Sequence, residues 1–208
     1  MKKLRDSRNV GRRALPEKIL ASAEALFYKY GIRKTTVGDI CREAGVSRMT
    51  FYKHYRDKVH AAENVVNKLV DEMIGNYLRI MNQNIPYEER IRQLIEMKLH
   101  KADGMSTPFI REIYASPYPA LHALLRRRMD ENLAIALAEF RKAKRRGHIR
   151  ADVKPEFLIA FLNIMADMVT DERLARLFAT PKELGAELMN LFFYGILKDG
   201  GRKNRRIR

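Results

Sequence analysis

The chain has a single cysteine and no long apolar segment, and both shortages exclude whole classes of protein. Because Cys41 is the only cysteine among the 208 residues, an internal disulfide is impossible, which is consistent with a reducing compartment. The longest apolar-rich run, residues 191–197, is far shorter than the roughly 20 residues that cross a bilayer. The first residues are charged and lack the apolar segment of a secretory signal. We therefore expect a cytoplasmic protein without a membrane partner.

Motifs of catalysis are lacking as well. The sequence contains no glycine-rich phosphate loop, no His-Glu-x-x-His zinc motif and no Gly-x-Ser-x-Gly nucleophile motif. The five histidines are scattered, so we predict neither an enzyme nor a bound cofactor or metal. Glu96, His100 and Asp103 share one helical face at i, i+4 and i+7, and they could hold a cation or form a polar helix surface.

Helical patterns dominate what the sequence does contain. From Lys58 onward apolar residues recur at helical spacing, and no segment alternates with the period of a β-strand. Thr107 is predicted to cap a short helix that has Pro108 as its first residue, and Thr180 is predicted to cap the last helix. The sequence predicts an all-α chain of about nine helices.

Residues 35–55 have the pattern of a helix-turn-helix. Thr36 can cap a first helix, with Asp39 three residues later closing a capping box. The residues spaced to bury one face of this helix are Val37, Ile40, Cys41 and Ala44. Gly45 is suited to the left-handed conformation that ends a helix, and Ser47 can cap the next one.

The helix after Ser47 carries side chains that are typical of a DNA-binding surface. Its first turn and the residues after it present hydrogen-bond donors and aromatic rings, which suit phosphates and base edges. These side chains are Arg48, Thr50, Tyr52, Lys53 and His54. An amphipathic segment, residues 17–30, precedes the motif and ends at Gly31, and Asp57 is the predicted cap of a long helix that follows.

The motif and its flanks resemble the tetracycline-repressor (TetR/AcrR) family of bacterial transcription regulators over residues 16–60. The matching residues are Ala25-Leu26-Phe27, Gly31, Thr35-Thr36-Val37, Asp39-Ile40, Ala44-Gly45-Val46-Ser47, Thr50-Phe51-Tyr52, His54-Tyr55 and Lys58. Met49 departs from the pattern, because the family often has glycine or another small residue there. The resemblance implies a three-helix DNA-binding head joined to a helical body that dimerises and binds a ligand.

On this basis we divide the chain into four parts. They are a basic disordered arm (residues 1–15), a helix-turn-helix domain (16–60), a helical ligand-binding and dimerisation domain (61–197) and a basic tail (198–208). The net charge of +16 is concentrated at the two ends, with +9 in residues 1–60 and +5 in residues 198–208. Such a positive field attracts polyanions. The arm could therefore reach DNA or remain a solvated tail.

Specific roles follow from the chemistry of the side chains and from the family positions they match. We expect Thr50, Tyr52 and Lys58 to contact phosphates, and Arg48, Lys53 and His54 to reach base edges. The full set of predicted DNA-binding residues is Thr36, Val37, Arg48, Met49, Thr50, Tyr52, Lys53, His54 and Lys58.

The body is predicted to hold two further surfaces. The family implies dimerisation through the last two long helices, with the apolar candidates Leu158, Phe161, Leu162, Met165, Leu188, Leu191 and Phe192. It also implies an apolar effector pocket, for which methionines and aromatics are suitable linings. The pocket candidates are Tyr77, Met81, Met97, His100, Phe109, Tyr114, Met129, Phe161 and Met165. Each of these could equally be core packing.

The sequence as a whole predicts a ligand-responsive, DNA-binding transcriptional regulator. We expect a homodimer that binds a palindromic operator as a repressor and is released by a small hydrophobic effector. Two alternatives stay open at this point. The basic ends would also suit a non-specific architectural DNA-binding protein, and residues 202–206 could touch a membrane surface, although no apolar anchor accompanies them.

Overall fold

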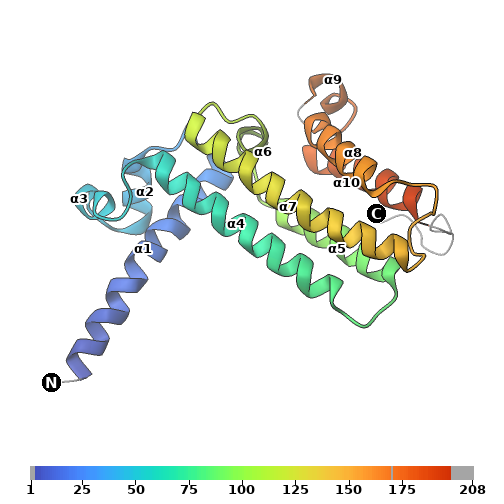
Figure 1. The fold of residues 1–208 in the computed structure, drawn as a ribbon. Coiled ribbons are helices and arrows are strands. Elements are labelled where there is room, and N and C mark those ends of the chain that lie inside the picture. The colour runs from blue at the N-terminus through green and yellow to red at the C-terminus, as the bar shows by residue number, and fades with distance from the viewer. Residues whose placement is uncertain (1–2, 170, 198–208) are drawn as a thin grey trace. The chain divides into compact units, whose positions relative to one another are not determined.

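The computed structural model describes residues 3–169 and 171–197, and it confirms an all-α chain (Figure 1). Ten helices lie in this part, and its one β contact is an isolated bridge between Ile149 and Leu197. The helices are α1 (Lys3–Tyr30), α2 (Val37–Ala44), α3 (Arg48–Tyr52), α4 (Lys58–Met81), α5 (Tyr87–Ala102), α6 (Thr107–Tyr114), α7 (Pro119–Arg145), α8 (Pro155–Met168), α9 (Glu172–Ala175) and α10 (Pro181–Ile196). None of them is both long and apolar enough to cross a membrane.

Helix α1 starts earlier than the sequence patterns indicate. We predicted a disordered arm over residues 1–15, whereas the helix begins at Lys3 and runs through Pro16. Arginine, lysine, alanine and leucine are strong helix formers, so a basic composition does not by itself disfavour a helix. Proline 16 removes one backbone donor from α1 without ending the helix.

The chain divides into two compact units, which differ from the division predicted at residue 60. The first, here called the head unit, comprises the residues up to Val70 together with Gly104–Leu125. The second, the body unit, comprises Asp71–Asp103 and the residues from Arg126 onward. Both α4 and α7 therefore contribute residues to each unit, and α6 belongs to the head unit.

The head unit has its own apolar core. Phe27 of α1, Phe51 of α3 and Phe109 of α6 are fully buried in it. Ile40, Cys41 and Ala44 are buried on α2, which confirms the predicted inner face of that helix. Burying these side chains fixes the orientation of α2 and α3 within the unit, because a large apolar side chain gains about 1.5–3 kcal/mol on full burial.

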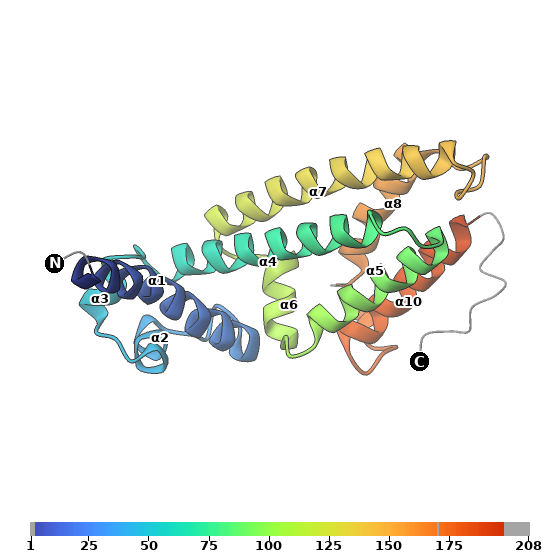
Figure 2. The ribbon, with the colours of Figure 1, turned by 90° about the horizontal axis from the view of Figure 1, so that it is seen from below.

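The body unit has a second core, in which α5 and α10 lie side by side (Figure 2). Ile91 and Ile95 of α5 and Phe193 of α10 are among its buried residues. At one end of this helix pair, Lys182 forms an ion pair with Asp103. Apolar burial along the pair and this ion pair at its end together set the register of the two helices.

Most of the predicted helix ends are confirmed. Asp57 caps α4 by accepting the His60 N–H at 2.8 Å, and Thr180 caps α10 by accepting the Glu183 N–H at 3.2 Å. The cap of α6 was predicted one residue too late, because Ser106 accepts the Phe109 N–H. Helix α9 was not predicted, since four residues are too few to show a helical period.

Candidate nucleic-acid interface

The start of α2 is held by a complete capping box, as predicted. The Thr36 hydroxyl accepts the Asp39 N–H at 3.1 Å, and the Asp39 carboxylate accepts the Thr36 N–H at 3.0 Å. The Thr36 hydroxyl also donates to the Asp39 carboxylate at 2.6 Å, and this bond, together with that from the Thr36 N–H, lowers the pKa of Asp39 below its ordinary value. The box fixes the first turn of α2 at the surface of the head unit.

The turn between α2 and α3 also forms as the sequence predicts. Gly45 has φ +62°, a left-handed conformation that side chains disfavour, and Ser47 accepts the Thr50 N–H at 3.1 Å. Phe51 is fully buried on the inner side of α3. The Tyr55 hydroxyl donates to the Pro16 carbonyl of α1 at 3.0 Å. One side of the second motif helix is therefore anchored to the rest of the unit.

The other side of α3 faces solvent. Arg48, Tyr52 and Lys53 are exposed, and Met49 is exposed over 72% of its surface. The Tyr52 and Phe51 rings pack edge to face, with ring centroids 5.5 Å apart. Contact with the buried Phe51 ring thus orients the exposed Tyr52 side chain. This surface combines cationic donors with an aromatic ring, which suits contact with a nucleic acid.

Other predicted DNA-binding residues have partners within the head unit. Thr50 is half-buried, and its hydroxyl lies 2.9 Å from that of Ser47. The Lys58 ammonium donates to the carbonyls of Arg33 and Thr35 at 2.9 and 2.8 Å, and burial lowers its pKa. Thr36 is exposed, whereas Val37 and His54 are half-buried. Lys58 thus braces the loop before α2, a structural task that the sequence did not predict.

Helix α6 holds the same loop from another direction, which sequence reasoning also missed. The Glu112 carboxylate accepts the Ile32 N–H at 2.5 Å and the Arg33 N–H at 3.2 Å. Gly31, at φ +83°, lies against this helix, and a Cβ there would be 3.2 Å from the Pro108 Cβ. No local sequence pattern could reveal these bonds, because they join residues about 80 positions apart.

The predicted effector-pocket residues are distributed over both units. Phe109 is buried in the core of the head unit, and Tyr114 follows it on α6 with 45% of its surface exposed. The remaining seven lie in the body unit, where Met81 and Met165 are buried, Tyr77, Met97 and Met129 are half-buried, and His100 and Phe161 are exposed. The two buried methionines take part in the apolar cluster of the body unit, as core packing does.

Of the three polar residues at i, i+4 and i+7 along and just after α5, the two carboxylates form ion pairs with other side chains. Glu96 binds Arg92, with nitrogen and oxygen 2.5 Å apart, and Asp103 binds Lys182. His100 lies 3.3 Å from the Asp103 carboxylate. Within the described residues there is no group of three His, Cys, Asp or Glu side chains that could hold a metal ion.

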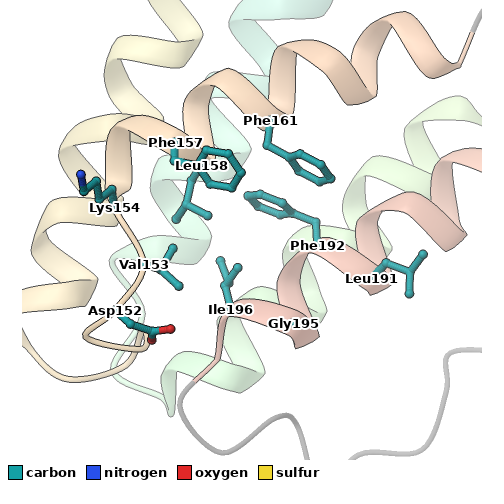
Figure 3. Close-up of a pocket in the computed structure, with 10 residues that line it drawn as sticks. All are labelled: Asp152, Val153, Lys154, Phe157, Leu158, Phe161, Leu191, Phe192, Gly195 and Ile196. Atoms are coloured by element: carbon teal, nitrogen blue, oxygen red, sulfur yellow. The ribbon is translucent and has the colours of Figure 1, made fainter.

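The predicted dimer residues are split between the interior and the surface of the body unit. Leu158, Met165 and Phe192 are buried, Leu162 and Leu188 are half-buried, and Phe161 and Leu191 are exposed. Between α8 and α10 lies an apolar hollow of about 500 Å³, in which the Phe161 and Phe192 rings stack at 6.0 Å (Figure 3). Two exposed residues of α8, Phe157 and Ile164, were missed, although their spacing from Phe161 at i−4 and i+3 places them on the same stripe.

Comparison with known proteins agrees with this geometry. Residues 19–60 match the profile of bacterial regulatory proteins of the tetR family. The transcriptional repressor KstR2 of Rhodococcus jostii (strain RHA1) is 27% identical to this chain over 86 residues, covering 41% of the chain and 42% of KstR2. The chain therefore spans less than half the length of this curated relative.

Solved structures share the fold over almost the whole chain. The fatty acid degradation regulator FadR from Bacillus halodurans has a TM-score of 0.67 at 16% identity, covering 91% of this chain and 97% of FadR. A protein from Saccharomonospora viridis, solved in complex with choline, has a TM-score of 0.68 at 17% identity, covering 88% of this chain and 97% of its own. At such low identity these likenesses establish the fold alone.

A short helix anchored by one apolar side and exposing basic side chains on the other defines a helix-turn-helix DNA-binding protein. Residues 19–60 of the chain correspond to the N-terminal domain of the tetR family of bacterial regulatory proteins. The matched profile describes regulatory proteins, which agrees with the DNA-binding regulator predicted from the sequence.

Proposed function

We propose that the protein is a homodimeric transcriptional repressor that binds a near-palindromic DNA operator and releases it when a small apolar effector binds. The observation that carries this proposal is the position of α3. Its apolar side is buried in the head unit, and its cationic and aromatic side is free to contact a duplex. The match of residues 19–60 to the tetR-family profile supports the same conclusion.

In the proposed complex, α3 enters the major groove of the operator. Arg48 and Lys53 are exposed and reach base edges, and His54 lies beside them, half-buried. Tyr52, Met49 and Thr36 are exposed at the same surface and contact phosphate, sugar or a thymine methyl group. Thr50, Val37 and Lys58 are half-buried. We propose that they pack beneath the interface and that their exposed atoms approach the DNA backbone.

A second copy of the chain is the proposed occupant of the α8–α10 hollow. The exposed apolar residues Phe157, Phe161, Ile164 and Leu191 lie on these two helices. Covering such a stripe with the same stripe of a partner gives the self-complementary contact of a two-fold dimer. The two α3 helices would then reach successive major grooves, about 34–36 Å apart or a multiple of that.

Repression and ligand release are proposed by analogy with relatives. KstR2 is a transcriptional repressor, and the Saccharomonospora viridis protein of the same fold was solved with choline. The body unit has buried and half-buried methionines, which adapt well to irregular apolar ligands. We place this regulator in the cytoplasm, where its operator lies.

DNA binding is tested by selecting bound duplexes from a random pool with the full chain and measuring dissociation constants over a range of salt concentrations. The double variant Arg48→Ala/Lys53→Ala should weaken binding at least about tenfold and flatten the dependence on salt, because two cationic contacts are lost. The control Arg145→Ala/Arg146→Ala removes the same charge from the exposed end of α7 and should bind normally. Equal effects of both variants would count against α3 as the reading helix.

Dimerisation is tested with a matched pair of leucines in the body unit. Leu191 lines the α8–α10 hollow and is 67% exposed, whereas Leu177 lies outside the hollow and is 73% exposed. In sedimentation equilibrium, Leu191→Glu should shift the protein to monomers, and Leu177→Glu should remain dimeric. A wild-type protein that is monomeric at micromolar concentration would refute the dimer.

A further inference from the structure

The side chain of Arg48 lies across the first turn of α2, over a glycine. Arg48 is the first residue of α3, and Gly38 is the second residue of α2. A Cβ added at Gly38 would lie 3.1 Å from the Arg48 Nη2 atom and 4.0 Å from its Cζ atom. The hydroxyl oxygen of Thr36, which caps α2, would be 3.5 Å away. The guanidinium thus occupies the space that a side chain at position 38 would take.

The backbone gives no reason for a glycine at this position. Among the described residues, positive φ angles occur at Gly31, Gly45, Gly104 and Gly147, and Gly38 is not one of them. Glycine in a helix is less favourable than alanine, because its backbone loses more freedom on folding. What is distinctive about Gly38 is therefore its missing side chain.

No carboxylate holds Arg48 in place. Within the part of the chain that the structure describes, the Arg48 side chain forms neither an ion pair nor a hydrogen bond. Burial raises the pKa of the Cys41 thiol on α2. The positive charge of the nearby Arg48 guanidinium opposes this rise. The missing side chain of Gly38 leaves room for the charged group at the junction of α2 and α3.

We infer that Gly38 is a positioning residue that determines where the Arg48 guanidinium meets DNA, and hence which base pair Arg48 discriminates. This inference rests on the proposed function. An arginine reads guanine through two parallel hydrogen bonds, and this geometry tolerates little displacement. A methyl group at position 38 would displace the guanidinium by a few tenths of an ångström, at little cost to folding because the far end of a flexible side chain can move.

The test is a double-mutant cycle on the full chain with Gly38→Ala, Arg48→Ala and the combined variant. Each is used to select duplexes from a random pool, and dissociation constants are measured for the best sequence and its single-base changes. Arg48→Ala should lower discrimination at one base pair about tenfold, within the range for a lost bidentate contact. Gly38→Ala should lower discrimination at the same base pair, and in the Arg48→Ala background it should have no further effect.

Gly75→Ala is the matched control. Gly75 is exposed on α4, and a Cβ there would meet no atom within 4 Å, so the same substitution raises helix propensity without touching Arg48. It should keep the wild-type preferences, and melting temperatures should show that Gly38→Ala is folded.

The outcomes separate the inference from the function on which it rests. A wild-type protein without any sequence preference would overturn the proposed function itself. A selective wild-type protein whose profile changes with Arg48→Ala but not with Gly38→Ala would overturn only the positioning role. An effect of Gly38→Ala that persists after Arg48 is removed would also overturn it, because the glycine would then act through the fold of α2.

Discussion

Two lysines of the DNA-binding segment show how the same side chain can take different tasks. Lys53 follows α3 and is exposed, whereas Lys58 is partly buried and donates to two carbonyl oxygens of the loop before α2. Burial lowers the pKa of Lys58, although the nearby Glu112 carboxylate opposes this shift. Lys58 is therefore placed to organise the loop, and Lys53 to meet a ligand in solvent.

This contrast leads to a prediction at the residue scale. Lys58→Ala should lower the free energy of unfolding by about 1–3 kcal/mol, as expected when two carbonyl groups lose a charged donor. Lys53→Ala should leave stability unchanged within about 0.5 kcal/mol, weaken duplex binding and lower discrimination at the base pair that Lys53 contacts. Chemical denaturation and duplex binding of both variants measure these quantities. A Lys58→Ala protein with wild-type stability would argue against the bracing role.

The residues of the helix-turn-helix differ in how well the sequence predicts them. Thr36, Asp39, Gly45 and Ser47 are recognisable because each acts on neighbours within a few positions, as caps and turns do. Lys58 is not predictable in this way, because its carbonyl partners lie 25 and 23 positions earlier in the chain. Family resemblance assigned it a phosphate contact, and the structure adds the contacts to the loop.

At the scale of elements, α6 is the main addition that the structure makes. The sequence placed this helix in the ligand-binding body, and the structure places it in the head unit. Its Glu112 binds the amides just after α1, and the Ser106 N–H at its start donates to the Tyr28 carbonyl of α1 at 2.7 Å. The end of α1 and the following loop are thus held by α6 as well as by Lys58.

Removing the Glu112 carboxylate should loosen this loop. In Glu112→Ala the Ile32 and Arg33 amides lose their acceptor, so we expect a loss of about 1–3 kcal/mol in stability. Hydrogen exchange should accelerate at these two amides more than elsewhere in the head unit. Glu187→Ala, which removes an exposed glutamate from α10, is the control. Unchanged exchange at Ile32 and Arg33 would contradict the proposal that Glu112 holds this loop.

Long elements are easier to predict than short ones or helix starts. The periodic apolar stripes of α4, α7, α8 and α10 are visible in the sequence, because each covers several turns. The four-residue α9 has no period to detect, and the start of α1 at Lys3 is hidden by a proline and a basic composition. Phe157 and Ile164 could have been found by extending the α8 stripe in both directions from Phe161.

At the scale of the whole molecule, the chain connects its two units three times. Helix α4 crosses from head unit to body unit after Val70, α7 crosses after Leu125, and the third connection lies at Gly104, which has φ +82°. Helix α4 begins beside the loop that Lys58 holds and ends in the apolar cluster of the body unit at Met81. Helix α4 therefore runs without a break from the helix-turn-helix segment into the body unit.

The proposed switch makes a quantitative prediction for the whole dimer. An effector can shift the equilibrium between DNA-binding and released states only by its difference in affinity for them. A hundredfold loss of operator affinity requires a difference of about 2.7 kcal/mol, and linkage requires the operator to weaken effector binding by the same factor. We therefore expect that a small apolar compound found by thermal shift lowers operator affinity, and that saturating operator lowers affinity for the compound equally. Calorimetry with and without operator measures the second quantity. A compound that stabilises the protein but leaves operator affinity unchanged would be a ligand and not an effector. If every stabilising compound behaved in this way, the proposal that effector binding releases the operator would be wrong.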